Sequence, residues 1–296
     1  MPGRHWAVAN LRVCDDTRAG TEFYPTTTTE ITVSSMVTPQ GIVHYEAYGR
    51  GRPVILLHGW INSWGVWEEF MIHLAESAPY KIYALDFWGF GESAKTMRGQ
   101  APPFKVMAYA QMVDQFMEAL GIMTAPVFGH SMGGTVALTL ALDFPERVSR
   151  ITVVGSPING TSLNVFLKMM GVDWIARVAW RMPMLVETFI RIILMRDPPR
   201  VKNMVLRDVQ RTSIESFFRS IGDLHHTDLE PRLGHLKVPV LGVYGEHDVI
   251  VDPKEARRLA ESARFSRIQM MPTSGHFPML DDSARFNETL RHYLEH

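Results

Sequence analysis

Residues 129–133, Gly-His-Ser-Met-Gly, are the part of the chain whose residue types and spacing point most directly to chemistry. A short apolar run, 125–128, precedes them, and a segment of helical composition, 134–142, follows. A serine on a sharp turn between a strand and a helix is exposed for nucleophilic attack, and flanking glycines let the chain turn tightly. The pattern predicts Ser131 as a nucleophile, although one G-x-S-x-G sequence arises by chance in roughly one chain in ten of this length.

A serine hydroxyl is a poor nucleophile at neutral pH unless a base accepts its proton and a third group orients that base. Asp248 follows the predicted strand 238–244, and His276 follows a predicted strand that ends at residue 271. Ligands bind at the carboxyl ends of parallel strands, so we expect both side chains near the serine. The sequence predicts His276 as the base and Asp248 as the orienting acid. Neighbouring carboxylates leave two alternative acids, Glu246 and Asp252.

Two backbone N–H groups are expected to stabilise the negative charge that develops on the substrate oxygen. One belongs to Met132, the residue after the nucleophile. The other is expected in the loop after the early buried strand 53–57, where His58, Gly59 and Trp60 follow. Gly59 permits a close approach of the backbone, and the N–H of Trp60 is the candidate donor.

The elements that must position these residues alternate between strand and helix. Continuous or alternating apolar runs predict strands at 31–37, 42–48, 53–57, 81–85, 125–128, 150–154, 238–244 and 268–271. Helical spacing predicts helices at 66–77, 109–120, 134–142, 253–263 and 283–294. This alternation predicts an α/β fold with a doubly wound, mostly parallel sheet and helices on both faces.

The alternation breaks in the middle of the chain, which predicts a domain organisation with an insertion. Residues 158–232 are helical in composition and are expected to form a cap on one α/β core made of 31–157 and 233–296. Residues 1–30 are expected to form a loosely ordered N-terminal arm. The core pattern resumes after the insertion, which favours one capped domain over two domains in tandem.

Five segments together resemble the α/β-hydrolase superfamily, and within it the serine hydrolases with a helical cap. They are Leu-Leu-His-Gly-Trp at 56–60, Asp-Phe-Trp-Gly-Phe-Gly-Glu-Ser at 86–93, Gly-His-Ser-Met-Gly-Gly at 129–134, Tyr-Gly-Glu-His-Asp at 244–248 and Gly-His-Phe-Pro at 275–278. The order Ser131, Asp248, His276 is the one that this resemblance implies. It also implies acyl transfer through an acyl-enzyme, with no cofactor. The most similar subgroups are small capped esterases, carbon–carbon bond hydrolases and cofactor-free haloperoxidase-like enzymes. Haloalkane dehalogenases and epoxide hydrolases, which use an Asp nucleophile, are disfavoured because residue 131 is Ser.

The substrate pocket is expected to include His58, His130, Trp64 and Phe277 beside the serine. A structural role is the alternative for two of them: His58 as a hydrogen-bonding organiser of its loop, and His130 as a filler of the turn. Asp86 also lies at a strand end, and in the family this position holds its loop, so we expect it to be structural.

The predicted cap is rich in large apolar and basic side chains. The apolar ones either pack the cap onto the core or line an acyl or aryl pocket: Met169, Met170, Trp174, Trp180, Met182, Met184, Phe189 and Met195. The basic ones are diluted by Asp173, Glu187 and Asp197, which favours a solvated face over an anionic partner: Arg177, Arg181, Arg191, Arg196 and Arg200.

Composition excludes several other functions. The formal net charge of −1 gives no electrostatic basis for binding nucleic acid or an anionic membrane. The single cysteine, Cys14, excludes an intramolecular disulfide framework and favours a reducing compartment, so we expect a cytoplasmic protein. No segment has the length of a transmembrane helix or the pattern of a signal peptide. His225 and His226 lack a third ligand at suitable spacing, so no metal site is expected.

The motifs together predict a hydrolase of a carboxylic ester with a small, largely apolar substrate. Two alternatives stay open: a carbon–carbon bond hydrolase of vinylogous diketones with the same catalytic residues, and a receptor-like or accessory protein with slow turnover. The motifs define neither the acyl chain length nor the oligomeric state.

Overall fold

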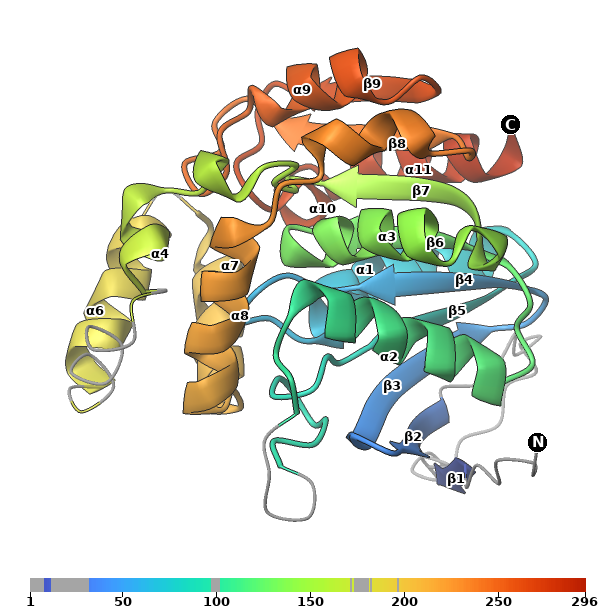
Figure 1. Cartoon of the computed structure of the whole chain (residues 1–296), viewed down its shortest axis with the longest axis horizontal. Coiled ribbons are helices and arrows are strands. Elements are labelled where there is room, and N and C mark those ends of the chain that lie inside the picture. Colours follow the sequence, from blue (N-terminus) through green and yellow to red (C-terminus); the bar gives the residue numbers. More distant parts are fainter. Residues whose placement is uncertain are drawn as a thin grey trace, which may run out of the picture.

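A twisted sheet runs through the protein and carries helices on both faces, as the computed structural model shows (Figure 1). The structure describes residues 8–11, 32–96, 102–170, 172, 181, 183–195 and 197–296. Within them the sheet has nine strands in the order β1-β2-β3-β5-β4-β6-β7-β8-β9. The first three strands pair antiparallel, as do β3 and β5, and all later neighbours pair parallel. The predicted fold class, a mostly parallel α/β sheet, is confirmed.

The strands begin and end close to the predicted positions. They are β1 Val8–Leu11, β2 Thr32–Thr38, β3 Gly41–Gly49, β4 Arg52–Leu57, β5 Tyr80–Leu85, β6 Ala125–His130, β7 Val148–Val154, β8 Val240–Gly245 and β9 Ser266–Met271. The short edge strand β1, which has four residues and lies inside the predicted N-terminal arm, was not predicted. Apart from 8–11, residues 1–30 lie outside the described part of the chain.

The core helices are α1 Glu68–Ser77, α2 Val106–Ala119, α3 Met132–Asp143, α9 Glu255–Ser262, α10 Pro278–Asp281 and α11 Ser283–Glu295. Short 3₁₀ turns accompany them: η1 Trp64–Trp67, η2 Pro145–Arg147, η3 Gly160–Ser162 and η4 Glu230–His235. Figure 1 shows α2 and α3 on one face of the sheet and α1 and α11 on the other. The short helix α10 was not predicted.

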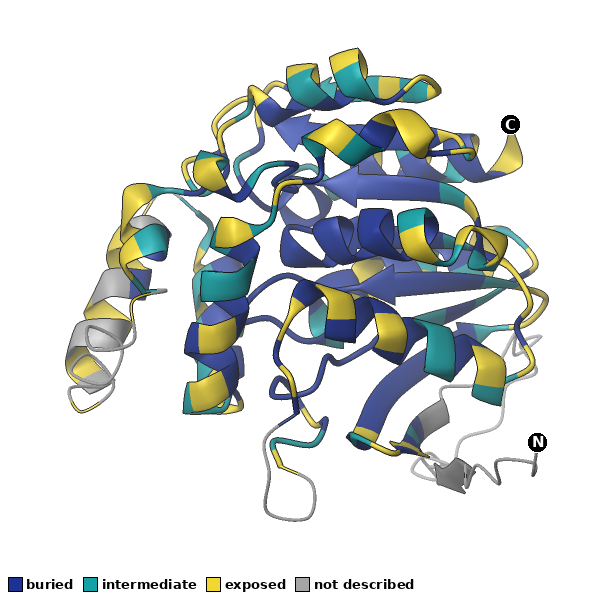
Figure 2. Ribbon diagram, in the orientation of Figure 1, coloured by how far each residue is buried: buried dark blue, intermediate teal, exposed yellow. Residues whose placement is uncertain are grey.

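The centre of the core is the helix that follows Ser131. Every residue of α3 from Met132 to Ala141 is buried (Figure 2), and the helix packs against β6, β7 and α2. A helix buried on all sides needs an apolar sequence, and its polar residues must find partners inside. Thr135 Oγ1 donates to the carbonyl oxygen of Pro157 at 2.8 Å, and Thr139 Oγ1 donates to that of Thr135 at 2.9 Å. This burial fixes the helix that begins at the candidate nucleophile.

Four described helices lie between β7 and β8 in the sequence: α4 Val165–Met170, α6 Pro183–Ile193, α7 Pro199–Gln210 and α8 Ile214–His226. We call them the cap helices. They gather at the carboxyl ends of the central strands (Figure 1), and α4 and α6 are more exposed than α7 and α8 (Figure 2). The boundaries of the cap at 158 and 232 stay a prediction. Several residues named for its apolar and basic content lie outside the described side chains: Asp173, Trp174, Arg177, Trp180, Met182, Phe189 and Arg196.

Candidate active site

Ser131 lies at the sharp turn between β6 and α3. Its backbone has φ 52° and ψ −121°, in the region that L-residues rarely adopt. Only one other described non-glycine residue, Ile61, has a positive φ. Such strain persists only where the surroundings enforce it, and it gathers at functional sites. Here the N–H of Ser131 donates to the carbonyl oxygen of Val154 at 2.8 Å, which ties the turn to the end of the neighbouring strand β7.

The glycine at 133 is required for this turn. A Cβ on Gly133 would lie 2.4 Å from the carbonyl oxygen of Leu57 and 2.5 Å from that of His58. Both atoms are backbone and cannot move aside. The start of α3 therefore packs directly against the end of β4, and the candidate nucleophile lies next to the loop that follows β4.

His276 and Asp248 lie in contact, as predicted for the base and its orienting acid. Nδ1 of His276 and Oδ2 of Asp248 are 2.7 Å apart, and both side chains are buried. The other carboxylate oxygen of Asp248 accepts from the N–H groups of Ile250 at 2.8 Å and Val251 at 3.0 Å. A carboxylate accepts only, so Nδ1 carries the proton and Nε2 of a neutral His276 is left as the base.

The two alternative acids do not fit this geometry. Glu246 and Asp252 are exposed, and Asp252 Oδ1 accepts from the N–H of Lys254 at 3.0 Å instead. Of the three nearby carboxylates, Asp248 is the one that contacts His276.

His130 supports His276 from the other side. Its Nε2 lies 2.9 Å from the backbone oxygen of His276 and must donate to it, and the two rings are 4.7 Å apart. Burial holds the pKa of His130 well below its usual value, so the ring is neutral. His130 is therefore a buried hydrogen-bond donor that holds the His276 backbone.

The loop after β4 brings the candidate oxyanion donors to the serine. A Cβ on Gly59 would lie 3.0 Å from Cβ of Ser131 and 2.8 Å from Nδ1 of His130, so glycine permits the close approach that we expected. The N–H of Trp60 donates to no acceptor within the described residues. Met132 begins α3, and N–H groups of a first helical turn have no partner inside their helix. Trp60 lines the pocket described below, whereas Met132 is fully buried next to Ser131, so the pair stays a prediction.

His58 organises this loop instead of lining the pocket. Its Nδ1 donates to the carbonyl oxygen of Gly59 at 2.6 Å, and its Nε2 accepts from the N–H of Phe87 at 2.9 Å. These two bonds fix one neutral tautomer, and burial lowers the pKa of His58 to about 4. The ring bridges the loops that follow β4 and β5.

A pocket joins the core residues to the cap. Ser131, His276, Trp60 and Phe277 line it, together with Ile61, Asn62 and Ile250, and the rest of its described wall is aliphatic: Leu163, Leu167, Ile190, Leu194, Val205, Ile221 and Leu224. Of the four residues that were predicted to line the pocket, Phe277 alone lies on this wall. His58, His130 and Trp64 do not line it: the rings of His58 and His130 are used in hydrogen bonds within the core, and Trp64 packs against the hydrophobic core.

The aliphatic wall could not be predicted residue by residue, since it depends on how the cap helices dock. Met170 packs against the hydrophobic core, whereas Met169, Met184 and Met195 are exposed, and none of these methionines lines the pocket. Within the described chain, leucine and isoleucine line it instead.

A family profile for the alpha/beta hydrolase fold matches residues 52–283. The chain belongs to the alpha/beta hydrolase fold family. The match spans the segments on both sides of the cap helices, and it supports the predicted fold class.

Several relatives of this α/β hydrolase are enzymes of different specificity. A 2-hydroxy-6-oxo-6-phenylhexa-2,4-dienoate hydrolase of Burkholderia cepacia is 25% identical over 298 residues, which cover 93% of this chain and 99% of the relative. A pimeloyl-[acyl-carrier protein] methyl ester esterase of Vibrio cholerae is 25% identical over 264 residues, 84% and 96% of the two chains. Among solved structures, an esterase from Exiguobacterium antarcticum has a TM-score of 0.75 at 23% identity, covering 86% and 96%. The similarity to the solved esterase structure shows the fold alone. The family and the named relatives support hydrolase chemistry.

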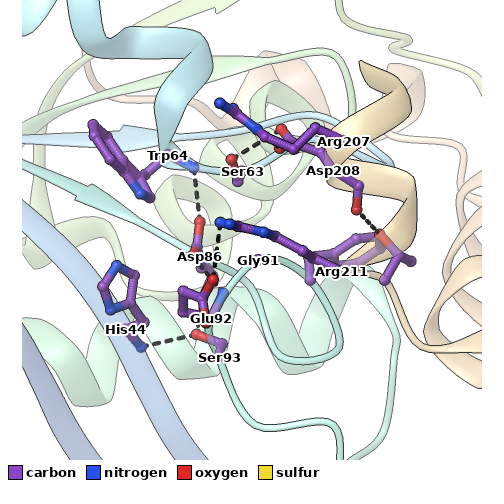
Figure 3. Close-up of polar contacts among 12 residues, drawn as sticks. His44, Ser63, Trp64, Asp86, Gly91, Glu92, Ser93, Arg207, Asp208 and Arg211 are labelled. Atoms are coloured by element: carbon purple, nitrogen blue, oxygen red, sulfur yellow. Dashed lines mark hydrogen bonds and ion pairs between the residues drawn. The ribbon is translucent and has the colours of Figure 1, made fainter. Parts of the chain in front are cut away.

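Cap helix α7 of this α/β hydrolase is tied to the core by polar contacts (Figure 3). Ser63 Oγ donates to Oδ2 of the buried Asp208 on α7 at 2.9 Å, and Arg211 pairs with Glu92 at 2.9 Å. Asp86 lies beside this cluster and accepts from the N–H groups of Trp64 at 2.7 Å and Glu92 at 2.9 Å. These bonds agree with the structural role expected of Asp86.

Burial raises the pKa of Asp86 to about 6, and its two backbone hydrogen bonds offset this only in part. The carboxyl group of Asp86 is fully buried beneath the loop that carries Ser63 and Trp64. Its ionisation is therefore coupled to the stability of that loop.

No group of three His, Cys, Asp or Glu side chains that could hold a metal ion occurs in the described ranges. The helices in the described ranges are too short or too polar to cross a membrane. His225 Nδ1 lies 3.2 Å from the carbonyl oxygen of Gly160, and His226 Nδ1 lies 2.7 Å from that of Gly222, so each ring is used in a local contact.

Proposed function

We propose that this chain is a serine hydrolase that cleaves the carboxylic ester of a small, largely apolar substrate through an acyl-enzyme. The observation that carries the proposal is the strained turn at Ser131, which shares one aliphatic pocket with a His276 ring already bonded to Asp248. A nucleophile, its base and the orienting acid are the minimum set for this chemistry.

The proposed reaction uses each residue in turn. Nε2 of His276 accepts the proton of Ser131 as Oγ attacks the ester carbonyl, and the N–H groups of Trp60 and Met132 donate to the developing oxyanion. The protonated His276 then gives its proton to the leaving alcohol oxygen. A water molecule, deprotonated by His276, hydrolyses the acyl-enzyme. Asp248 keeps the Nδ1 proton in place and stabilises the imidazolium in both half-reactions.

The carbon–carbon bond hydrolases named among the relatives act on dienoates, which carry a carboxylate. Burying a carboxylate requires a cationic or multiply hydrogen-bonding partner. Within the described part of the chain, the pocket wall contains no Lys or Arg, and Asn62 is its one polar side chain besides Ser131, His276 and the indole of Trp60. This wall favours an uncharged ester over a dienoate.

A receptor-like protein would keep the same residues but turn over slowly. The N–H of Trp60, which has no acceptor among the described residues, supports catalysis, since a donor beside a serine nucleophile can stabilise an oxyanion.

The test combines labelling with kinetics. We expect a fluorophosphonate to label the wild-type protein at Ser131 and to leave Ser131→Ala unlabelled, and p-nitrophenyl esters of two to eight carbons to be hydrolysed with kcat of at least about 1 s⁻¹. A 2-hydroxy-6-oxo-6-phenylhexa-2,4-dienoate assayed in parallel should turn over at least tenfold more slowly. Faster turnover of the dienoate would assign the chain to carbon–carbon hydrolases, and labelling with negligible turnover of either would indicate a receptor-like protein.

A further inference from the structure

The loop that carries the candidate oxyanion donor also brings an unused amide to the pocket. The N–H of Asn62 donates to the carbonyl oxygen of Gly59 at 3.3 Å, which closes a tight turn over residues 59–62. Ile61 occupies this turn with φ 52°, in spite of its β-branched side chain. The turn places Trp60, Ile61 and Asn62 together on the pocket wall.

Nδ2 of Asn62 has no hydrogen-bond partner among the described residues, and the side chain is only 2% exposed. Buried amide donors in folded proteins are almost always paired, and an unpaired one destabilises the fold. Ser131 and His276 carry the potential side-chain acceptors of the neighbouring wall, which is otherwise aliphatic apart from Trp60, and Nδ2 is bonded to neither. Asn62 lines a mainly apolar pocket, and a few polar groups on such a wall are the arrangement by which ligand sites fix orientation.

A second, polar pocket suggests which part of the substrate meets Asn62. It shares His276 and Ile250 with the aliphatic pocket and is otherwise lined by residues such as Asp197, His247 and Asp281. The leaving alcohol must lie next to His276, which protonates it, so this polar side suits the alcohol. The acyl chain then occupies the aliphatic pocket, where Asn62 lies.

We propose that Asn62 is a specificity-determining residue, whose amide donates to an oxygen atom on the acyl chain of the substrate. The preferred substrates are therefore esters of oxygen-substituted acids, such as oxo acids, rather than of plain alkanoic acids. This inference rests on the proposed function for its catalytic readout, but the binding that it describes does not need turnover.

The kinetic test compares matched p-nitrophenyl esters, pentanoate against 4-oxopentanoate and hexanoate against 5-oxohexanoate. For at least one pair we expect the wild type to prefer the oxo ester in kcat/KM by about 10-fold, mainly through KM. Asn62→Leu should abolish that preference. Because the substitution removes an unpaired donor, it should also raise Tm by about 2–4 °C.

Asn287→Leu is the matched control. Asn287 on α11 is also buried, its Oδ1 is also unpaired, and it does not line the pocket. This variant should keep the wild-type preference between the two esters. An equal loss of kcat/KM on oxo and plain esters in Asn62→Leu would make Asn62 a further oxyanion donor and overturn the proposal, as would an unchanged preference.

A binding measurement separates this inference from the proposed function. In the Ser131→Ala background, methyl 4-oxopentanoate or methyl 5-oxohexanoate should raise Tm more than the matching plain methyl ester, and Asn62→Leu should remove the difference. Selective binding without turnover of any ester by the wild type would refute the esterase and keep the role of Asn62. Turnover of an ester by the wild type, together with equal binding of the oxo and the plain methyl ester, would support the esterase and refute the role of Asn62.

Discussion

The indole Nε1 of Trp60 donates to the backbone oxygen of Phe217 at 2.8 Å, and the two rings lie 4.4 Å apart. Trp60 belongs to the loop after β4, whereas Phe217 belongs to cap helix α8. The residue whose N–H is expected to stabilise the oxyanion is thus held by the cap. Cap position and oxyanion geometry are therefore linked by one buried hydrogen bond.

Trp60→Phe should test this link, because it removes the indole N–H and keeps an aromatic ring against Phe217. We expect kcat to fall by about 10- to 100-fold with KM within about threefold, since a small displacement of the backbone donor weakens transition-state stabilisation. Steady-state kinetics on a p-nitrophenyl ester measure both constants. Trp67→Phe is the matched control, because the indole N–H of Trp67 is buried and has no partner among the described residues. Equal kinetics in the two variants would argue against the link.

Ser131→Ala should lower kcat by roughly 10⁵–10⁶ and leave KM or ligand affinity largely intact, because the oxyanion donors and the pocket remain. The far-UV circular dichroism spectrum should be unchanged. Alanine must adopt the same φ of 52°, so the backbone strain at this position is unchanged and gives no reason for unfolding. Residual turnover near the wild-type rate would remove Ser131 from the mechanism.

Asp248→Asn should lower kcat by about 10⁴, because an amide at this position allows the wrong tautomer of His276. The expected structural change is small, since Asn keeps an oxygen that can accept from Ile250 and Val251. Asp252→Asn is the matched control: its carboxylate is four residues away, exposed, and bonded to the N–H of Lys254. If Asp252→Asn were the inactive variant, the orienting acid would be assigned wrongly.

The local parts of this site could be predicted from the sequence because each is a short contiguous segment at a strand end. The turn at Ser131 needs glycines within two residues of it, and Asp248 and His276 follow strands whose apolar runs are plain. In a parallel sheet such strand ends meet, so proximity follows from strand order.

Contacts between distant segments could not be predicted in this way. Trp60 and Phe217 are 157 positions apart, and nothing in either segment specifies the other. The direction of a side chain is equally hidden: His58 and His130 flank the site in sequence, but both point into hydrogen bonds of the core. Asn62 was missed because an asparagine in a loop is usually a turn residue, and only the finished pocket shows that its amide has no partner.

The contact between Ser63 and Asp208 should stabilise the docking of α7. Asp208→Ala is expected to lower the free energy of unfolding by about 1–3 kcal/mol, because it leaves the buried Ser63 hydroxyl without its acceptor. The exposed Arg207, which also contacts Asp208, should contribute little. Urea denaturation of Ser63→Ala, Asp208→Ala and the double variant gives the coupling energy. A coupling energy near zero would show that the contact does not hold the cap.

Asp86 should make the stability of the protein depend on pH. Its pKa is raised from 3.8 to about 6 in the folded protein, so protonation favours folding: the contribution is complete below about pH 4 and is lost as pH rises through 6. Between pH 4.5 and 7.5 the loss amounts to about 2 kcal/mol.

Urea denaturation of the wild type and of Asp86→Asn at both pH values isolates this contribution, since the amide does not titrate. We expect the free energy of unfolding of the wild type, relative to the variant, to be about 2 kcal/mol lower at pH 7.5 than at pH 4.5. Asp228→Asn is the control, because it makes the same substitution at an exposed position and should not reproduce this difference. A wild-type advantage that grows as pH rises would mean that the folded protein stabilises the ionised form of Asp86, in which case the two N–H donors of Trp64 and Glu92 outweigh burial.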